Sequence, residues 1–147
     1  MLKRRVIKQG AMTMEINVAP DKLTGTTTMS GQSKPIDVDP GGVLFADGPG
    51  GLDVIASLPL ADGYALSFRN FDVQKQKPQI KQLKVLGSES VTVPAGTFDA
   101  YKVEIVHADN DAEKQTVWID KASRKVLKIS AVLPSLNGAV LTSELTP

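Results

Sequence analysis

The chain has 147 residues, a length at which one domain can bury a single core without disulfides. Its 17 basic and 16 acidic residues leave a net charge of +1, which gives no field that attracts nucleic acid. The absence of cysteine excludes disulfides and thiolate catalysis, and the single histidine excludes a multi-histidine metal site within one chain. We therefore expect a single folded domain over residues 1–147, with no cofactor and no nucleic-acid partner.

The start of the chain resembles a targeting signal only in its charge. Residues 1–5 include three basic side chains, but Val6 and Ile7 are followed at once by Lys8, so the apolar part of a signal peptide is missing. No apolar run approaches the ~20 residues that span a bilayer. We expect neither a signal peptide nor a membrane span in this chain.

Alternation of apolar and polar side chains predicts a β-hairpin in the first quarter of the chain. Residues 12–18 form the first strand, and a threonine-rich strand over 23–30 returns antiparallel to it. A basic edge strand over 2–9 and a short extended segment over 34–39 flank this hairpin. The first quarter is therefore predicted to be β structure.

A change of period marks one short helix. The glycine-rich segment 41–51 predicts a loop, after which Leu52 and Ile55 share a helical face and Pro59 ends the pattern. We expect this helix over Pro49 to Leu58, set against the concave side of a curled sheet.

The second half predicts an antiparallel meander. Gly87 indicates a bulge, Pro94 and Gly96 indicate a sharp reversal, and Asn137 with Gly138 forms the strongest two-residue hairpin signal. Polar residues over 70–79 predict an exposed loop or a ragged edge. The predicted strands cover residues 64–68, 80–93, 99–107, 114–120, 125–133 and 139–145, with an acidic turn before the fourth.

Three segments carry a family resemblance: TVPAGTFDAYKVEI at 92–105, TVWID at 116–120 and KVLKISAVLP at 125–134. Over residues 91–133 the chain resembles a bacterial family of domains of unknown function, number 3108. The resemblance implies a periplasmic or secreted β-rich domain, similar to the curled half-barrel of lipoprotein carriers of the LolA and LolB type. It implies no activity. The residues that match the family do so as structural positions: Pro94, Gly96, Phe98, Tyr101 and Trp118.

The chain departs from this family at its start. Members usually begin with a signal peptide and opening strands, and neither is found upstream of Met12. The chain therefore looks like a fragment, an appended domain or a shortened relative. An edge strand left unpaired would invite a partner strand or a homodimer.

His107 is the one candidate for a catalytic base. A Ser-His-Asp hydrolase would use His107 beside Ser88 or Ser90, with Asp109 orienting the imidazole. No G-x-S-x-G elbow accompanies these residues, so the alternative is a half-exposed histidine at the mouth of a hairpin.

An acidic segment follows His107 and raises the question of a metal. Asp109, Asp111 and Glu113 have the oxygen spacing of the start of a calcium loop, but the required glycine and distal glutamate are absent. We expect a solvated turn and no metal.

Aromatic and aliphatic side chains form the last candidate site. If the helix and the sheet leave a gap, these side chains would hold an acyl chain or another hydrophobic small molecule; otherwise they form the core. The set comprises Ile55, Leu58, Tyr64, Phe68, Tyr101 and Trp118.

We therefore expect a mainly β fold, an antiparallel and strongly curled sheet or half-barrel of about eight to ten strands with one short helix on its concave face. The first functional hypothesis is a non-enzymatic envelope-type domain that binds a hydrophobic ligand or a protein partner on that face. The alternatives are a small esterase-like hydrolase using His107 and a structural domain appended to a larger secreted enzyme.

Overall fold

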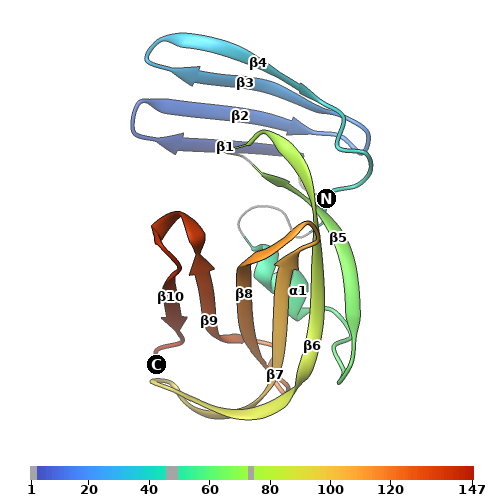
Figure 1. Cartoon of the computed structure of the whole chain (residues 1–147), viewed down its shortest axis with the longest axis vertical. Helices are drawn as coiled ribbons and strands as arrows, with labels where there is room; N and C mark the ends of the chain where they lie inside the picture. Colours follow the sequence, from blue (N-terminus) through green and yellow to red (C-terminus); the bar gives the residue numbers. More distant parts are fainter. Residues whose placement is uncertain (1–2, 46–49, 73–74) are drawn as a thin grey trace. The chain divides into compact units, whose positions relative to one another are not determined.

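The computed structural model describes residues 3–45, 50–72 and 75–147, and for Asp111 and Ser135 it describes the backbone only. The chain folds into two compact units, Met1–Gly48 with Arg69–Gln79 and Pro49–Phe68 with Ile80–Pro147. A four-stranded antiparallel sheet lies in the first unit, and most of a six-stranded antiparallel sheet lies in the second (Figure 1). Within the described ranges, no helix is long and apolar enough to cross a bilayer.

The four-stranded sheet is a meander with its strands in chain order. Its strands are β1 (Arg4–Gln9), β2 (Met12–Val18), β3 (Leu23–Met29) and β4 (Gln32–Val38). Ser30 and Gly31 form the tight β3–β4 turn with φ values of 49° and 82°, the left-handed geometry that two-residue hairpin loops favour. β4 begins earlier than the extended segment expected at 34–39, and it contains Pro35, which an edge strand tolerates because one row of its N–H groups has no partner.

Gly25 lets the backbones of β2 and β3 approach closely at the centre of this sheet. It pairs with Ile16 on one side and Ile36 on the other. A Cβ atom at Gly25 would lie 1.9 Å from the carbonyl oxygen of Glu15, and its φ of 157° is one that side-chain-bearing residues rarely adopt. Only glycine fits this position.

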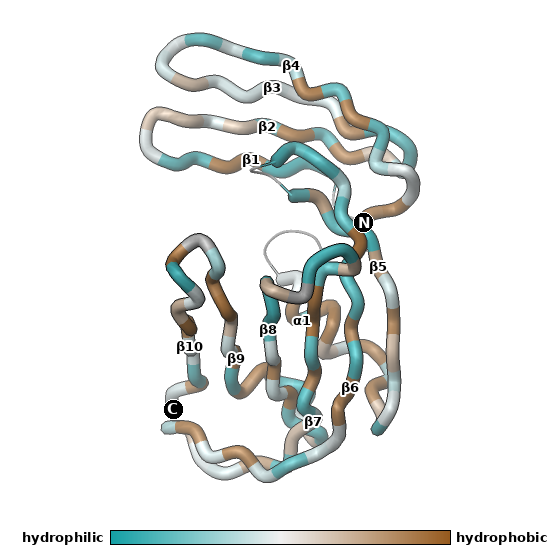
Figure 2. Tube along the Cα trace, in the orientation of Figure 1, coloured by the Kyte–Doolittle hydropathy of each residue, from teal (hydrophilic) through white to brown (hydrophobic). Residues whose placement is uncertain are grey.

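The core of the first unit lies on one face of the four-stranded sheet. Phe71, from a segment that follows the sheet by more than thirty residues, packs there against side chains of β2, β3 and β4. The buried cluster is Met14, Ile16, Leu23, Ile36 and Phe71, with Ile7, Val18, Val38 and Leu44 half-buried around it. Figure 2 shows the matching alternation of hydrophobic and hydrophilic residues along the strands.

The second sheet follows the order β10-β9-β8-β7-β6-β5. Its strands are β5 (Ala65–Asp72), β6 (Lys77–Val93), β7 (Gly96–His107), β8 (Asn110–Asp120), β9 (Val126–Leu133) and β10 (Ala139–Glu144). The helix α1 (Gly51–Ala56) buries Ile55 and Ala56 and contacts β9, and the short 3-10 helix η1 (Pro134–Leu136) precedes the last turn. The helix is shorter than the predicted 49–58, and the predicted start at Pro49 lies outside the described residues.

A bulge in β6 moves its apolar residues from one face of the sheet to the other. Val85 pairs with Val103 and Gly87 pairs with Lys102, so Leu86 is an extra residue without a partner. Val91 and Val93 consequently join Ala100 and Leu127 in a cluster on the face opposite to that of Val85. The bulge predicted at Gly87 is therefore confirmed, and it lets one strand support two apolar clusters.

The prediction of an antiparallel, mainly β protein with one short helix is confirmed. Neither sheet is closed or strongly curled, and the strands divide between two sheets rather than one. The acidic turn expected after His107 is wrong in extent, because β8 begins at Asn110 and leaves only Ala108 and Asp109 in the turn. The polar segment 70–79 is likewise not all loop, since β5 continues to Asp72 and β6 begins at Lys77.

Candidate functional site

The serines and the histidine considered for a Ser-His-Asp arrangement lie far apart along the paired strands β6 and β7. His107 is opposite Lys81 on β6, whereas Ser88 is opposite Tyr101, six residues back along β7. At ~3.3 Å per residue this separates the serine and the histidine by about 20 Å. Ser88 donates a hydrogen bond to Asp62 (2.9 Å), and the structure does not bring these groups together.

The same holds for Ser90, which lies two residues farther from His107 and is opposite Asp99. His107 Nε2 lies 3.0 Å from Glu113 Oε2, so the carboxylate beside the imidazole is Glu113 rather than the exposed Asp109. This pair links β7 and β8 beside their two-residue turn.

Two of the three acidic residues weighed as calcium ligands are described with their side chains, and these two have separate surroundings. Glu113 is engaged with His107, Asp109 is exposed in the two-residue turn, and the side chain of Asp111 lies outside the described residues. Within the described part of the chain, no group of three or more histidine or acidic side chains is placed to hold a metal ion.

The predicted hydrophobic set is distributed over both faces of the six-stranded sheet. Ile55 and Phe68 are buried, and Leu58 and Tyr64 are half-buried. Trp118 points to the face opposite that of its neighbour Ile119, and it packs against the cluster that contains Ala100 and Leu127. The set therefore does not form a single lining.

Tyr101, also in that set, is flanked by cations. The Lys121 ammonium and the Arg124 guanidinium each lie 5.3 Å from its ring centroid. The turn that carries them is held by Asp120, which accepts hydrogen bonds from the backbone N–H (2.8 Å) and hydroxyl of Ser123. Burial would raise the pKa of Asp120, but these hydrogen bonds and nearby Lys125 outweigh it, and the pKa lies below its ordinary value.

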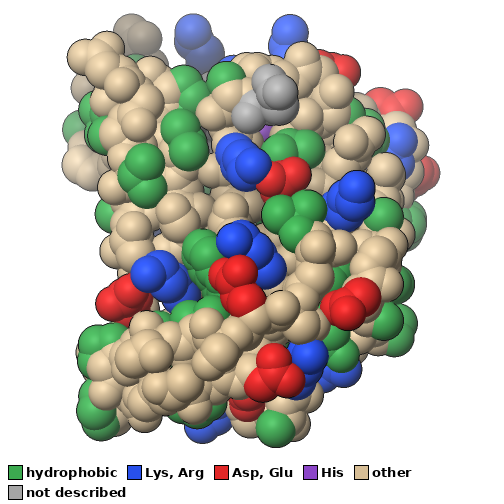
Figure 3. Space-filling view, turned by 60° about the horizontal axis from the view of Figure 1, so that its bottom comes forward, with side chains coloured by type: hydrophobic (Ala, Val, Ile, Leu, Met, Phe, Trp, Pro, Cys, Tyr) green, Lys and Arg blue, Asp and Glu red, His purple; other side chains and the backbone are tan. Residues whose placement is uncertain are grey.

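Trp118 belongs to a chain of polar contacts that crosses five strands. Its indole N–H donates to Glu89 (2.6 Å), and the ammonium groups of Lys102 and Lys128 lie 5.5 and 5.8 Å from its ring centroid. Lys128 continues the chain to Glu144 (2.7 Å). The hydrogen bond from Trp118 is the main reason that the pKa of Glu89 lies below its ordinary value. Figure 3 shows basic and acidic side chains lying side by side on the molecular surface.

A groove of about 970 Å³ lies on the four-stranded sheet, on the same face as the core of that unit. One cross-strand row of its floor consists of Ile7, Met14, Thr27 and Lys34. The next row, toward the hairpin turns, consists of Gln9, Met12, Met29 and Gln32. We call this feature the methionine groove, because it contains every methionine of the chain except Met1.

The groove exists because the core covers only part of the sheet. Phe71 packs on Met14, Ile16 and their neighbours, and Gln76 donates a hydrogen bond to Thr27 (3.1 Å). Beyond this point the face is open, so exposure rises from 2% at Met14 to 59% at Met29. Apolar side chains therefore remain accessible next to a packed core.

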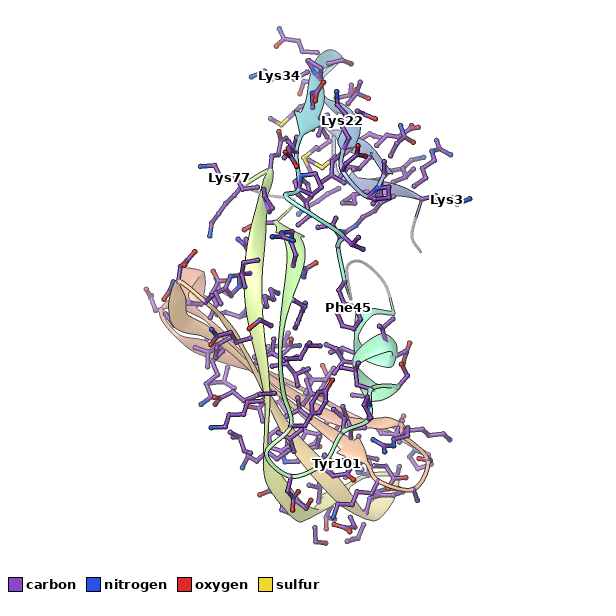
Figure 4. All side chains as sticks on the ribbon, turned by 90° about the vertical axis from the view of Figure 1, so that its right-hand side faces the viewer. Lys3, Lys22, Lys34, Phe45, Lys77 and Tyr101 are labelled. Atoms are coloured by element: carbon purple, nitrogen blue, oxygen red, sulfur yellow. The ribbon has the colours of Figure 1, made fainter. Side chains whose placement is uncertain are left out.

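The charges around the methionine groove have one sign. Arg5 on β1 and Lys34 on β4 line it from the two edges of the sheet, and among the described lining residues none is acidic. The carboxylates of these strands lie on the opposite face, where Glu15 pairs with Arg4 (2.8 Å) and Asp37 with Lys22 (3.0 Å). Figure 4 shows Lys34 and Lys22 at the four-stranded sheet.

Sequence reasoning places Met12, Met14 and Met29 on the inner faces of their strands, but it does not identify a binding surface there. The sequence does show that the apolar alternation of residues 12–18 and 23–29 continues up to the hairpin turns beside Met12 and Met29. The residues that cover part of this face are Phe71 and Gln76, which lie some forty residues later in the chain. The length of the covered part therefore cannot be inferred from local alternation.

Comparison with known proteins returns one family. The sequence model described as "Protein of unknown function (DUF3108)" matches residues 8–145. No curated protein and no solved structure matches the chain. The matched range includes the three methionines of the groove and all strands of the six-stranded sheet.

Proposed function

We propose that this chain, which belongs to the DUF3108 family of proteins of unknown function, is a non-enzymatic binding protein that holds a hydrophobic ligand in the methionine groove. The observation that carries the proposal is the apolar floor that Ile7, Met12 and Met29 form beside the buried Met14. Its volume of about 970 Å³ falls at the upper end of the 300–1,000 Å³ typical of small-molecule sites.

The composition of the floor suits ligands of variable shape. Methionine side chains are unbranched and polarisable, and they adjust to irregular apolar surfaces better than branched residues do. The polar side chains Gln9, Gln32 and Gln76 at the border of the groove can orient one end of a ligand. These features support binding of a flexible chain, such as an acyl chain, more than binding of a rigid planar ring.

The cellular setting that we propose is the periplasm or the outside of the cell, and it follows from the resemblance to envelope proteins. A likeness to lipoprotein carriers of the LolA and LolB type is part of the same proposal. The groove supports only its ligand-binding aspect, since the sheet that bears it has four strands and is open.

Fluorescence titration with N-phenyl-1-naphthylamine, a neutral apolar probe, tests this function. Met29→Asp places a charge in the groove at an exposed position, and we expect the Kd for the probe to rise roughly tenfold. The matched control is Leu141→Asp, because Leu141 is 57% exposed on the edge strand β10 of the other sheet. Unchanged binding by Met29→Asp, or an equal loss in the control, would exclude the methionine groove as the site.

A further inference from the structure

We infer that the ligand of the methionine groove is an amphipathic anion, an alkyl chain whose carboxylate, phosphate or sulfate headgroup is held at the β4 edge by Lys34. This inference rests on the proposed function, because it assigns a chemical class to the ligand of the same site. It follows from three observations: the alternation of the strands, the distribution of charge and the place where the apolar floor ends.

Alternation fixes which charges face the ligand. Lys34 pairs with Thr27, which pairs with Met14, so the lysine and the methionine project from the same face. The adjacent residues Ser33 and Pro35 project from the other face, as successive residues of a strand do. Lys34 thus stands at the end of the cross-strand row that contains Met14.

Among the described residues, no carboxylate neutralises the charge of Lys34. Within the described residues Lys34 has no ion-pair partner, in contrast to Lys22, which pairs with Asp37 on the opposite face. A ligand with a negative headgroup is therefore favoured over a neutral or cationic ligand of the same length.

The position of Lys34 also fixes the orientation of the ligand. The methionines lie on the inner strands β2 and β3, whereas Lys34 lies on the edge strand β4 and is exposed. A chain on the methionines would bury its methylene groups while its headgroup stayed at the solvated edge beside the ammonium. A lysine in such a position can move its long stem over the apolar surface and keep its charge in water.

The test measures competition with N-phenyl-1-naphthylamine by ligands that share a twelve-carbon chain. Dodecanoate and dodecyl phosphate represent free fatty acids and phosphate-headed lipids, and dodecanol and dodecyltrimethylammonium are the neutral and cationic counterparts. We expect both anions to bind about three- to tenfold more tightly than dodecanol at low salt, with a smaller ratio at 0.5 M salt. A ratio between the two anions other than one identifies the preferred headgroup source.

Lys34→Gln should remove the preference for the anions and leave the affinity for dodecanol unchanged. The matched control is Lys8→Gln, which changes net charge equally but lies on the opposite face of β1, since Arg5, Ile7 and Gln9 line the groove. Equal binding of dodecanol and the anions, a preference for the cation, or a preference that survives Lys34→Gln overturns this inference and leaves the proposed function standing. Failure of all four ligands and of the probe to bind overturns both.

Discussion

The two sheets differ in how completely their apolar side chains are covered. In the six-stranded sheet, the central strands bury Leu83 and Val103 on one face and Ala100 on the other. In the four-stranded sheet, one face is covered near Ile16 and open near Met29, and the other face is mainly polar. The six-stranded sheet therefore has buried side chains on both faces, whereas the four-stranded sheet leaves apolar side chains accessible beside its core, where we propose that a ligand binds. The predictions below test this division.

The largest loss of stability should come from adding a side chain where the backbones of β2 and β3 approach closely. Gly25→Ala puts a Cβ atom against the Glu15 carbonyl oxygen, and we expect a loss of at least about 3 kcal/mol in the free energy of unfolding. Gly87→Ala is the control, because Gly87 has a similar φ of 147° with no atom within 4 Å of the added Cβ. Urea denaturation monitored by circular dichroism measures both, and equal losses would show that backbone strain, not the close approach, decides the cost.

A pair of truncations should separate stability from binding. Leu83→Ala removes a fully buried side chain from the six-stranded sheet, and we expect a loss of about 3 kcal/mol. Met29→Ala removes an exposed side chain and should change stability by less than about 0.5 kcal/mol while weakening probe binding. Denaturant titrations and probe fluorescence on both variants measure the contrast. A large loss of stability in Met29→Ala would mean that the groove is part of the core.

The smallest expected effect is a change in the pKa of Glu89, in the series of polar contacts on the six-stranded sheet. Trp118→Phe removes the indole hydrogen bond, so the pKa of Glu89 should rise toward its ordinary value of 4.5, measured by NMR titration of the carboxyl carbon. Because the folded-state pKa is lowered, Glu89 contributes stability above pH 4.5 that is lost as pH falls through the folded-state pKa. Trp118→Phe should therefore reduce the part of the free energy of unfolding that is lost on acidification.

Lys102→Gln is the comparison variant for this pKa. Lys102 lowers the pKa of Glu89 through a hydrogen bond and through its charge, and each of these contributions is smaller than that of the hydrogen bond from Trp118. Glutamine can still donate a hydrogen bond, so we expect the replacement to give a smaller rise than Trp118→Phe. A larger rise in Lys102→Gln than in Trp118→Phe would show that charge, rather than the indole hydrogen bond, controls Glu89.

Local patterns predict most of the strands because strands with one buried face alternate in sequence. The strand predicted over residues 12–18 has the observed bounds of β2, and the bulge at Gly87 follows from a glycine inside a strand. The family resemblance over 91–133 is confirmed by a match that extends over residues 8–145. The separation into two sheets is not predicted, because local alternation carries no information on which strands pair.

The candidate sites show the same limit. The residues predicted to bind a ligand include Phe68 and Trp118, which are apolar enough to line a pocket. Phe68 is instead buried in the core, and Trp118 packs against the separate cluster that contains Ala100 and Leu127. Met29 has the same place in the alternation as a core residue. It is exposed because Phe71 packs on Met14 and Ile16 and does not extend over the sheet as far as Met29. Composition identifies apolar faces, and only tertiary contacts show which part of a face stays open.

Pro35 on the edge strand β4 bears on solubility. An open apolar face beside an unpaired edge is the arrangement from which sheets grow into aggregates. Pro35 offers no N–H to an incoming strand, and the other edge of the sheet carries Arg4, Arg5 and Lys8. Addition of strands is thus discouraged at both edges of the sheet that carries the exposed methionines.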